Sequence, residues 1–231
     1  MALSESRRTV SAHDVALREI RDLILTGEFQ PGAQITQETV AARLGLSVIP
    51  VREALKSLQG EGQVEFVPRR GFFVSEYSRE DLLEICAIRA ALEGMAIRQG
   101  IPLMTPAVIA AMRDAEARMR EADAAADVIA FLAADRRFHF ALLAPGSGPQ
   151  LHRVLTSLWD RSDHYRAKFL SDSATRHSNH HEHDEIVRAV EARDTERVIE
   201  LLDAHRLGAL KGLEQGAAAV GGTPPGPADR R

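Results

Sequence analysis

Histidine and aspartate side chains in the C-terminal half of the chain have the spacing of a metal site. Asp135 and His139 are four residues apart in a helical run, so a carboxylate and an imidazole share one helix face. His183 and His205 lie at the inner edges of two later helical stripes. Three helices of a bundle can bring such side chains together in its core. Three neutral imidazoles and one carboxylate suit a divalent metal ion, Zn²⁺ or Ni²⁺.

Three alternatives to a metal that binds an effector remain open. An inward-facing histidine is often a hydrogen-bonded core residue, and a metal could serve only to lock the bundle. A catalytic metal with an open position would make the protein a metal-dependent hydrolase, but the sequence shows no clear general base beside the cluster, so we predict that the protein is not an enzyme. The nearby His177, His180 and His181 are too crowded to converge and are predicted to be solvent-exposed.

A second segment whose residues could bind a ligand runs from Ser47 to Lys56. Ser47 can cap a helix, and Pro50 then falls in the first turn, where its missing N–H costs little. The apolar residues at helical spacing are Val51, Ala54, Leu55 and Leu58. Arg52 and Lys56 are four residues apart and project from one side, off this stripe. A short helix that is apolar behind and cationic in front suits the DNA major groove.

The surrounding elements are expected to form a winged helix-turn-helix. Apolar spacing predicts helices over 13–26 and 36–44, and Gly45 ends the second of them. Two helices joined by a short turn make a helix-turn-helix. After Gly62 the apolar period changes to two, which predicts a β-hairpin around residues 68–71.

The turn of this hairpin carries Arg69, Arg70 and Gly71. Guanidinium groups at such a turn can contact phosphates or enter a minor groove. The alternative is a solvated loop. We predict DNA contacts here, because the helix-turn-helix immediately precedes the turn.

From Ser78 onward the pattern is helical throughout. Ser78 followed by Asp81 is typical of a helix start. Short connections between amphipathic helices predict an antiparallel all-α bundle of about six helices, and hence a mostly α protein. The expected helices cover 81–99, a segment starting at 105, 127–143, 150–170, 180–192 and 195–213. The expected domains are a disordered N-terminus (1–10), the winged helix-turn-helix (11–76), the bundle (77–214) and a disordered tail (215–231).

Composition limits the class of protein. The 231 residues carry a net charge of −4, so any DNA contact must come from a local basic patch. Cys86 is the single cysteine, which excludes a disulfide framework and fits a reducing compartment. The first residues contain no apolar segment typical of a secretory signal, and no stretch approaches the length of a membrane span, so we expect neither feature. We therefore expect a cytoplasmic protein without a membrane partner.

Several motifs resemble those of a known family. In the N-terminal part they are Phe29-Gln30-Pro31-Gly32, Leu44-Gly45-Leu46-Ser47, Pro50-Val51-Arg52-Glu53-Ala54-Leu55 and Glu61-Gly62. In the helical part they are Arg89-Ala90-Ala91-Leu92-Glu93, Asp135-Arg136-Arg137-Phe138-His139, Glu182-His183 and Asp203-Ala204-His205. Across about residues 12–212 the chain resembles the GntR superfamily of bacterial transcription regulators, in its FadR-type branch with an FCD ligand-binding domain.

The resemblance implies a homodimer that binds double-stranded operator DNA and responds to a small organic acid. The four residues of the His/Asp cluster match positions that hold a divalent metal in many FCD domains. Arg89 matches an arginine that often faces the effector cavity, where it could pair with a carboxylate; an ion pair with Glu93 is the alternative. Arg52 matches an arginine of the recognition helix that contacts DNA.

Two departures from the family pattern affect these expectations. The residue after Ser47 is usually an arginine that reads DNA, and here it is Val48, followed by Ile49. The substitution removes a guanine-reading donor, so we expect base contact to shift toward Arg52 and Lys56 and the operator to differ. Residues 144–149 also lack an asparagine that is common in the family, which affects the expected loop geometry near the cavity.

Overall fold

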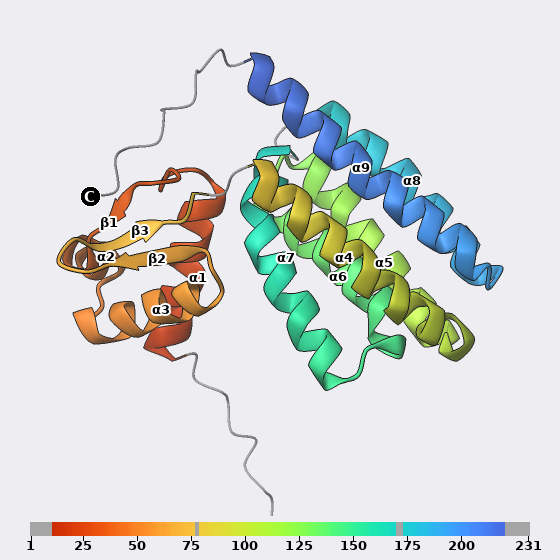
Figure 1. Ribbon diagram of the computed structural model, residues 1–231, viewed down its shortest axis with the longest axis horizontal. Helices are drawn as coiled ribbons and strands as arrows, with labels where there is room; N and C mark the ends of the chain where they lie inside the picture. Colours follow the sequence, from red (N-terminus) through yellow and green to blue (C-terminus); the bar gives the residue numbers. More distant parts are fainter. Residues whose placement is uncertain (1–10, 77–78, 170–172, 220–231) are drawn as a thin grey trace, which may run out of the picture. The chain divides into compact units, whose positions relative to one another are not determined.

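The structure, a computed structural model, describes residues 11–76, 79–169 and 173–219 (Figure 1). The chain divides into two compact units, and each is described by itself. The first comprises Met1–Ser78 together with Ser157–His164, and the second comprises Arg79–Thr156 and Tyr165–Arg231.

The first unit contains the predicted winged helix-turn-helix. Its helices are α1 (Ala12–Leu25), α2 (Gln37–Leu44) and α3 (Val48–Gly60), and its strands are β1 (Gln34–Ile35), β2 (Val64–Val67) and β3 (Gly71–Val74). The strands form an antiparallel sheet in the order β1-β3-β2, in which Phe66 of β2 pairs with Phe72 of β3. The hairpin of β2 and β3 was predicted, whereas β1 was not, because two residues are too few to show a period.

Burial of the apolar stripe positions α3. Val51, Ala54, Leu55 and Leu58 are each 0% exposed and belong to one hydrophobic cluster with residues of α1 and the sheet. Gly45 ends α2 in the left-handed region at φ 65°, as a C-terminal glycine commonly does. Ser47 occupies the N-cap position of α3, but its side chain makes no capping hydrogen bond, so that part of the prediction is wrong.

The second unit is the predicted helical bundle. Its described helices are α4 (Arg79–Gly100), α5 (Pro106–Ala124), α6 (Val128–Leu143), α7 (Pro149–Phe169, shared with the first unit), α8 (Ser173–Glu191) and α9 (Thr195–Ala219). Thr105 caps α5 by accepting a hydrogen bond from the Val108 N–H at 3.3 Å, and Asp127 caps α6 in the same way. The predicted cap at Ser78 lies outside the described residues.

Two boundaries differ from the prediction. Helix α8 begins at Ser173, before the predicted start near residue 180, and α9 continues to Ala219, past the predicted start of the tail. The first turns of α8 consist mostly of polar side chains and the end of α9 mostly of small ones. Neither segment therefore shows the apolar spacing from which a helix is predicted. A short 3₁₀ turn, Ala144–Gly146, joins α6 to α7. Gly146 is required there because a Cβ at this position would collide with the carbonyl oxygen of Ala96 on α4.

None of the helices in the described ranges is both long and apolar enough to cross a membrane. The core of the bundle contains Phe131 and Phe138 of α6, each 0% exposed. Asp135 and His139 lie on the same buried face of α6 and are therefore held inside the bundle.

Candidate metal centre and DNA-binding surface

The four predicted residues of the His/Asp cluster meet inside the bundle. Asp135 and His139 come from α6, His183 from α8 and His205 from α9. Each residue offers one ligand atom, and these atoms all lie within 4.8 Å of one another. Asp135, His139 and His183 are buried, and His205 is partly buried. The arrangement could bind a metal ion.

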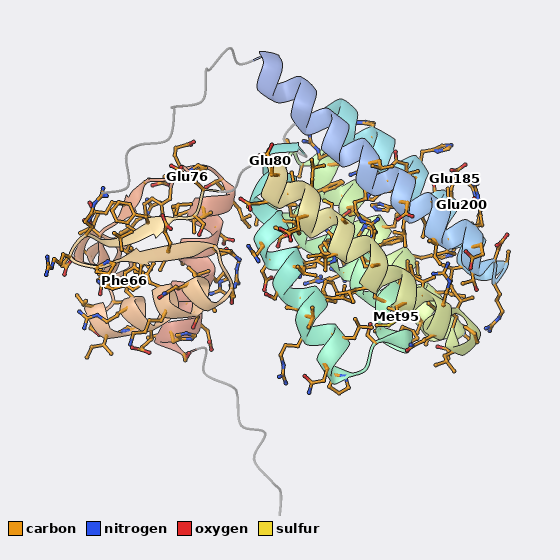
Figure 2. The ribbon with its side chains drawn as sticks, viewed as in Figure 1. Phe66, Glu76, Glu80, Met95, Glu185 and Glu200 are labelled. Atoms are coloured by element: carbon orange, nitrogen blue, oxygen red, sulfur yellow. The ribbon has the colours of Figure 1, made fainter. Side chains whose placement is uncertain are left out.

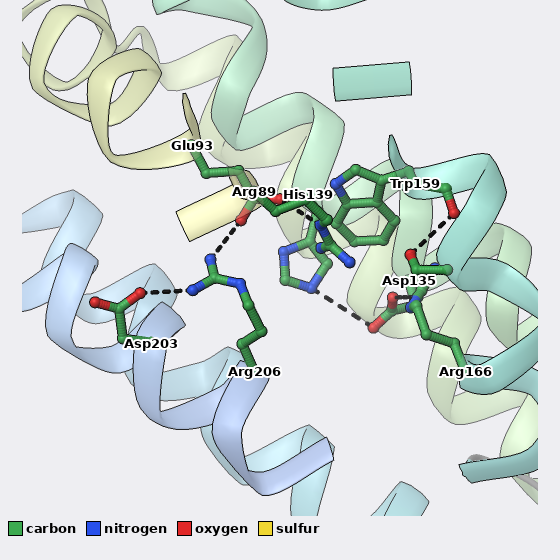
Figure 3. A network of polar contacts seen from close by, with 9 residues as sticks. Arg89, Glu93, Asp135, His139, Trp159, Arg166, Asp203 and Arg206 are labelled. Carbon is green, nitrogen blue, oxygen red and sulfur yellow. Dashed lines mark hydrogen bonds and ion pairs between the residues drawn. The ribbon is translucent and has the colours of Figure 1, made fainter. Parts of the chain in front are cut away.

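Asp135 lies between two of the imidazoles. Its Oδ1 is 3.4 Å from His183 Nε2 and 3.8 Å from His139 Nε2. Its other oxygen, Oδ2, accepts a hydrogen bond from the guanidinium of Arg166 on α7 (Figure 3). One oxygen therefore faces the imidazoles while the other is held by a cation.

The hydrogen bonding of the cluster fits a divalent ion. Asp135 Oδ1 and both ring nitrogens of His183 are buried and make no hydrogen bond. Buried polar atoms are nearly always satisfied, and a metal would satisfy Asp135 Oδ1 and one of the two His183 nitrogens. His205 Nδ1 lies 2.6 Å from Glu182 Oε2, the kind of contact that orients a ligating imidazole from outside the coordination sphere.

Burial also sets the protonation of the cluster. Loss of solvent, and secondarily the neighbouring His205, lowers the pKa of His139 and of His183 well below the ordinary value. Both imidazoles are therefore neutral near pH 7. The neutral form is the one that binds metals.

A buried network of charges connects α4 with α9 beside the cluster (Figure 3). Glu93 Oε1 accepts a hydrogen bond from Arg89 Nε at 3.0 Å, and Oε2 accepts one from Arg206 at 2.6 Å. Burial opposes ionisation of Glu93, but the two guanidinium groups outweigh it, and the pKa of this carboxyl is below its usual value. The ion pair between Arg89 and Glu93 is thus present, and a role of Arg89 toward an effector stays a prediction.

Sequence reasoning missed Arg166 and Arg206. Arg206 directly follows His205 and could have been considered for that reason. Arg166 gives no comparable signal, because its partner Asp135 lies on another helix.

The prediction for the neighbouring histidines is correct for two of three. His177 and His181 are exposed, but His180 is only 7% exposed and its Nε2 lies 3.2 Å from Asp123 Oδ2. The cause is the early start of α8: three residues before His183, His180 falls on the same inner face.

The predicted DNA-contacting residues of α3 occupy two environments. Arg52 is exposed, and its Nε donates to Gln37 Oε1 at 2.8 Å; Lys56 is exposed and donates to Glu53 at 3.0 Å. Val48 is half-buried and packs against the hydrophobic cluster, whereas Ile49 is 74% exposed. The apolar group that α3 presents to solvent at its start is therefore Ile49.

The wing turn has an unusual backbone. Arg69 has φ 65° and Gly71 has φ 96°, both in the left-handed region. The Arg70 guanidinium lies over the ring of Phe73, 5.0 Å from its centroid, and the Arg70 carbonyl accepts a hydrogen bond from Gln34 at 2.5 Å. Arg69 and Arg70 are both exposed, which is required of residues that would contact DNA.

Two protein families match the chain, one for each part. The model described as "Bacterial regulatory proteins, gntR family" matches residues 13–74, and the FCD domain matches residues 84–208.

The named relatives are transcriptional regulators and not enzymes. This confirms the prediction, made from the sequence, that the protein is not an enzyme. An uncharacterized HTH-type regulator of Agrobacterium vitis is 37% identical over 132 residues, 56% of this chain and 77% of the relative. McbR of Escherichia coli is 27% identical, covering 77% of this chain and 81% of McbR. The repressor GlaR of Escherichia coli is 28% identical, covering 87% and 95%.

Solved structures show the same fold. The structure of Escherichia coli McbR/YncC has a TM-score of 0.79 at 24% identity and covers 90% of this chain and 100% of the other. A putative GntR regulator from Rhodococcus sp. RHA1 has a TM-score of 0.74 at 24% identity and covers 88% and 97%. By its two family matches and the motifs that they contain, the chain belongs to the GntR family of transcriptional regulators, in the FadR-type group that carries an FCD domain.

Proposed function

We propose that a small carboxylate effector, bound at the His/Asp cluster of the FCD domain, changes the affinity of this regulator for its operator. The observation that carries the proposal is that Asp135, His139, His183 and His205 come together inside the bundle, and that Asp135 Oδ1 and the ring nitrogens of His183 are buried without a hydrogen bond. These residues would hold a divalent ion, Zn²⁺ or Ni²⁺ by the chemistry of the donors. When bound, the ion would supply an open coordination position for a carboxylate oxygen.

The surrounding residues have positioning roles in this proposal. Arg166 holds the outer oxygen of Asp135, so the inner oxygen is directed at the imidazoles. Glu182 fixes the ring of His205. Arg89 would pair with the carboxylate of the effector. Glu93 would orient the Arg89 guanidinium by accepting a hydrogen bond from Arg89 Nε.

DNA recognition is assigned to the winged helix-turn-helix, with domain limits near residues 11–76 and 77–214. Two copies would bind the half-sites of a pseudo-palindromic operator in the cytoplasm, as helix-turn-helix dimers do. Base and phosphate contacts would come from the exposed side of α3 and from the wing. The assigned residues are Ser47, Val48, Arg52, Lys56, Arg69, Arg70 and Gly71.

The metal assignment is tested by comparing two histidines of α8. His183→Ala removes a buried member of the cluster, and His181→Ala removes an exposed histidine of the same helix. After loading with Zn²⁺ or Ni²⁺ and desalting, we expect one ion per chain in the wild type and in His181→Ala, and none in His183→Ala. Full metal content in His183→Ala would refute the assignment.

The regulatory assignment is tested by fluorescence anisotropy with the DNA upstream of the chain's own gene. We expect sequence-selective binding that weakens steeply with salt. A panel of small mono-, di- and hydroxycarboxylates should contain a compound that shifts this affinity for the metal-loaded protein and not for the chelated protein. Equal shifts with chelated protein would leave the metal a structural role only and refute effector ligation.

A further inference from the structure

A second carboxylate in the bundle faces two imidazoles, outside the His/Asp cluster. Asp123 lies in the last turn of α5, and its Oδ2 is 3.2 Å from His180 Nε2 and 3.5 Å from His177 Nδ1 on α8. Its other oxygen, Oδ1, accepts a hydrogen bond from Arg176 Nε at 2.5 Å. We call Asp123, His177 and His180 the outer triad. None of its members has a part in the metal, effector or DNA assignments above.

The packing of α5 against α8 brings the outer triad together. Arg120 of α5 donates a hydrogen bond to Asp184 of α8 at 3.0 Å, which fixes how the two helices are aligned. The helices run antiparallel, so Asp123, further along α5, lies opposite the part of α8 that precedes Asp184. The two histidines of the triad are three residues apart there, on one face of the helix. Helix α8 can be followed in Figure 2, where Glu185 labels its C-terminal half.

The outer triad repeats the arrangement around Asp135. In both places one carboxylate oxygen is held by a guanidinium group and the other faces two imidazoles. A carboxyl must be ionised to bind a metal. Burial opposes ionisation of Asp123, but hydrogen bonds from Arg176 and His180 outweigh it, and the pKa of this carboxyl is below its usual value. Asp123 is therefore a carboxylate near pH 7.

The distances fit a tetrahedral divalent ion. Zinc bonds of about 2.0–2.2 Å place two ligand atoms about 3.3–3.6 Å apart. The contacts from Asp123 Oδ2 to the two imidazoles, at 3.2 Å and 3.5 Å, are close to this spacing. His180 is 7% exposed, and its ring meets the ring of Phe131 edge-on, with centroids 5.7 Å apart. The exposed ring of His177 has its centroid 6.3 Å from that of His180, so it would turn toward the ion to complete the site.

An ion at the outer triad would be held less tightly than one at the His/Asp cluster. The triad offers three ligands instead of four, which leaves a position for water. His177 is exposed, and Arg176 places a positive charge beside the carboxylate. Such an ion would exchange with the solvent and would be lost during desalting, whereas an ion in the buried cluster would be retained.

We propose that Asp123, His177 and His180 form a second, exchangeable site for a divalent ion, which ties the end of α5 to the start of α8. The site shares no residue with the His/Asp cluster and does not depend on the metal or the effector assigned there. His183 follows His180 by three residues on the same helix. An ion at the outer triad therefore stabilises the helix that carries one member of the inner cluster.

The number of bound ions before and after desalting tests the proposal. In equilibrium dialysis of the full chain against excess Zn²⁺, we expect two ions per chain in the wild type, of which one is lost on desalting. His177→Ala should lack the ion that desalting removes, whereas His183→Ala should lack the ion that desalting leaves. Failure of the outer site and failure of the inner site are therefore distinguishable. Absence of the removable ion from the wild type, or its presence in His177→Ala, would overturn the proposal.

The matched control is His181→Ala, on the same helix. His177 and His181 are both exposed and lie four residues apart, so this pair could chelate an ion without Asp123. We expect His181→Ala to keep the removable ion and Asp123→Asn to lose it, with thermal unfolding as the check that each variant is folded. Loss of this ion in His181→Ala, or its retention in folded Asp123→Asn, would assign it to the exposed pair and refute the outer triad.

Hydrogen exchange locates the ion independently of its stoichiometry. Excess Zn²⁺ added to the desalted, metal-loaded protein should slow amide exchange at the end of α5 and in the first turns of α8. The same addition should have no effect there in His177→Ala. Unchanged exchange of these segments in wild-type protein that has bound the second ion would place that ion elsewhere and overturn the proposal.

Discussion

The winged helix-turn-helix and the metal cluster are built in opposite ways. Residues assigned to DNA come from two short stretches, 47–56 and 69–71, and most of them are exposed. The cluster draws on α6, α8 and α9, spans residues 135–205, and is buried apart from His205. The first site depends on local structure, and the second depends on how three helices pack. Changes to the second should therefore affect the stability of the bundle, and changes to the first should affect binding alone.

The largest expected difference between the two regions follows from metal removal. An ion present at 1,000 times its dissociation constant stabilises the state that binds it by about 4 kcal/mol. We expect amide hydrogen exchange in α6, α8 and α9 to accelerate strongly when the metal-loaded protein is treated with a chelator. Exchange in α1 to α3 should stay the same. Equal acceleration in both units would show that the cluster does not act locally.

Breaking the buried ion pairs beside the cluster should have an effect of about the same size. Glu93→Gln leaves Arg89 and Arg206 buried without their shared carboxylate, and breaking a buried pair costs about 3–5 kcal/mol. Chemical denaturation should show a loss of unfolding free energy close to this range. The control is Glu196→Gln, which breaks an exposed pair with Arg98 and should cost less than about 1 kcal/mol.

A smaller loss, confined to DNA binding, is expected for Arg52→Ala. Removing a base-contacting arginine costs about 1–3 kcal/mol, or roughly 5- to 150-fold in operator affinity. Metal content and unfolding free energy should not change, because Arg52 is exposed and bonds only to Gln37 among the described residues. Arg18→Ala, at an exposed arginine of α1, is the control. Equal losses for both variants would mean that Arg52 contributes only general charge.

The smallest expected change concerns which operator sequence is preferred, and not the affinity for DNA. Val48→Arg restores a guanine-reading group at the start of α3, so binding-site selection should return a different preferred operator. Ile49→Arg is the comparison, since Ile49 is 74% exposed whereas Val48 packs partly against the core. If only Ile49→Arg changes the preferred sequence, the reading edge of α3 lies at position 49.

The elements of both units were predictable where the local pattern is strong. Gly45, Thr105 and Asp127 mark helix ends that the structure confirms. Prediction failed where a residue's role depends on another element. Strand β1 is a two-residue pairing partner of β3, and His180 is buried because α8 starts early and meets Asp123 of α5.

The amino-acid sequence by itself determined most of the helices, the recognition helix, the hairpin of the wing and the identity of the cluster residues. The spacing of apolar residues, the helix caps and the turn residues act within a few positions of the chain, so they can be recognised without knowledge of the tertiary structure. Only the tertiary structure decided the surroundings of these residues: the Arg166 contact to Asp135, the Arg89–Glu93–Arg206 network and the approach of Asp123 to His177 and His180. These features arise from packing between helices that are distant in the sequence, and no local pattern specifies which of their side chains will meet.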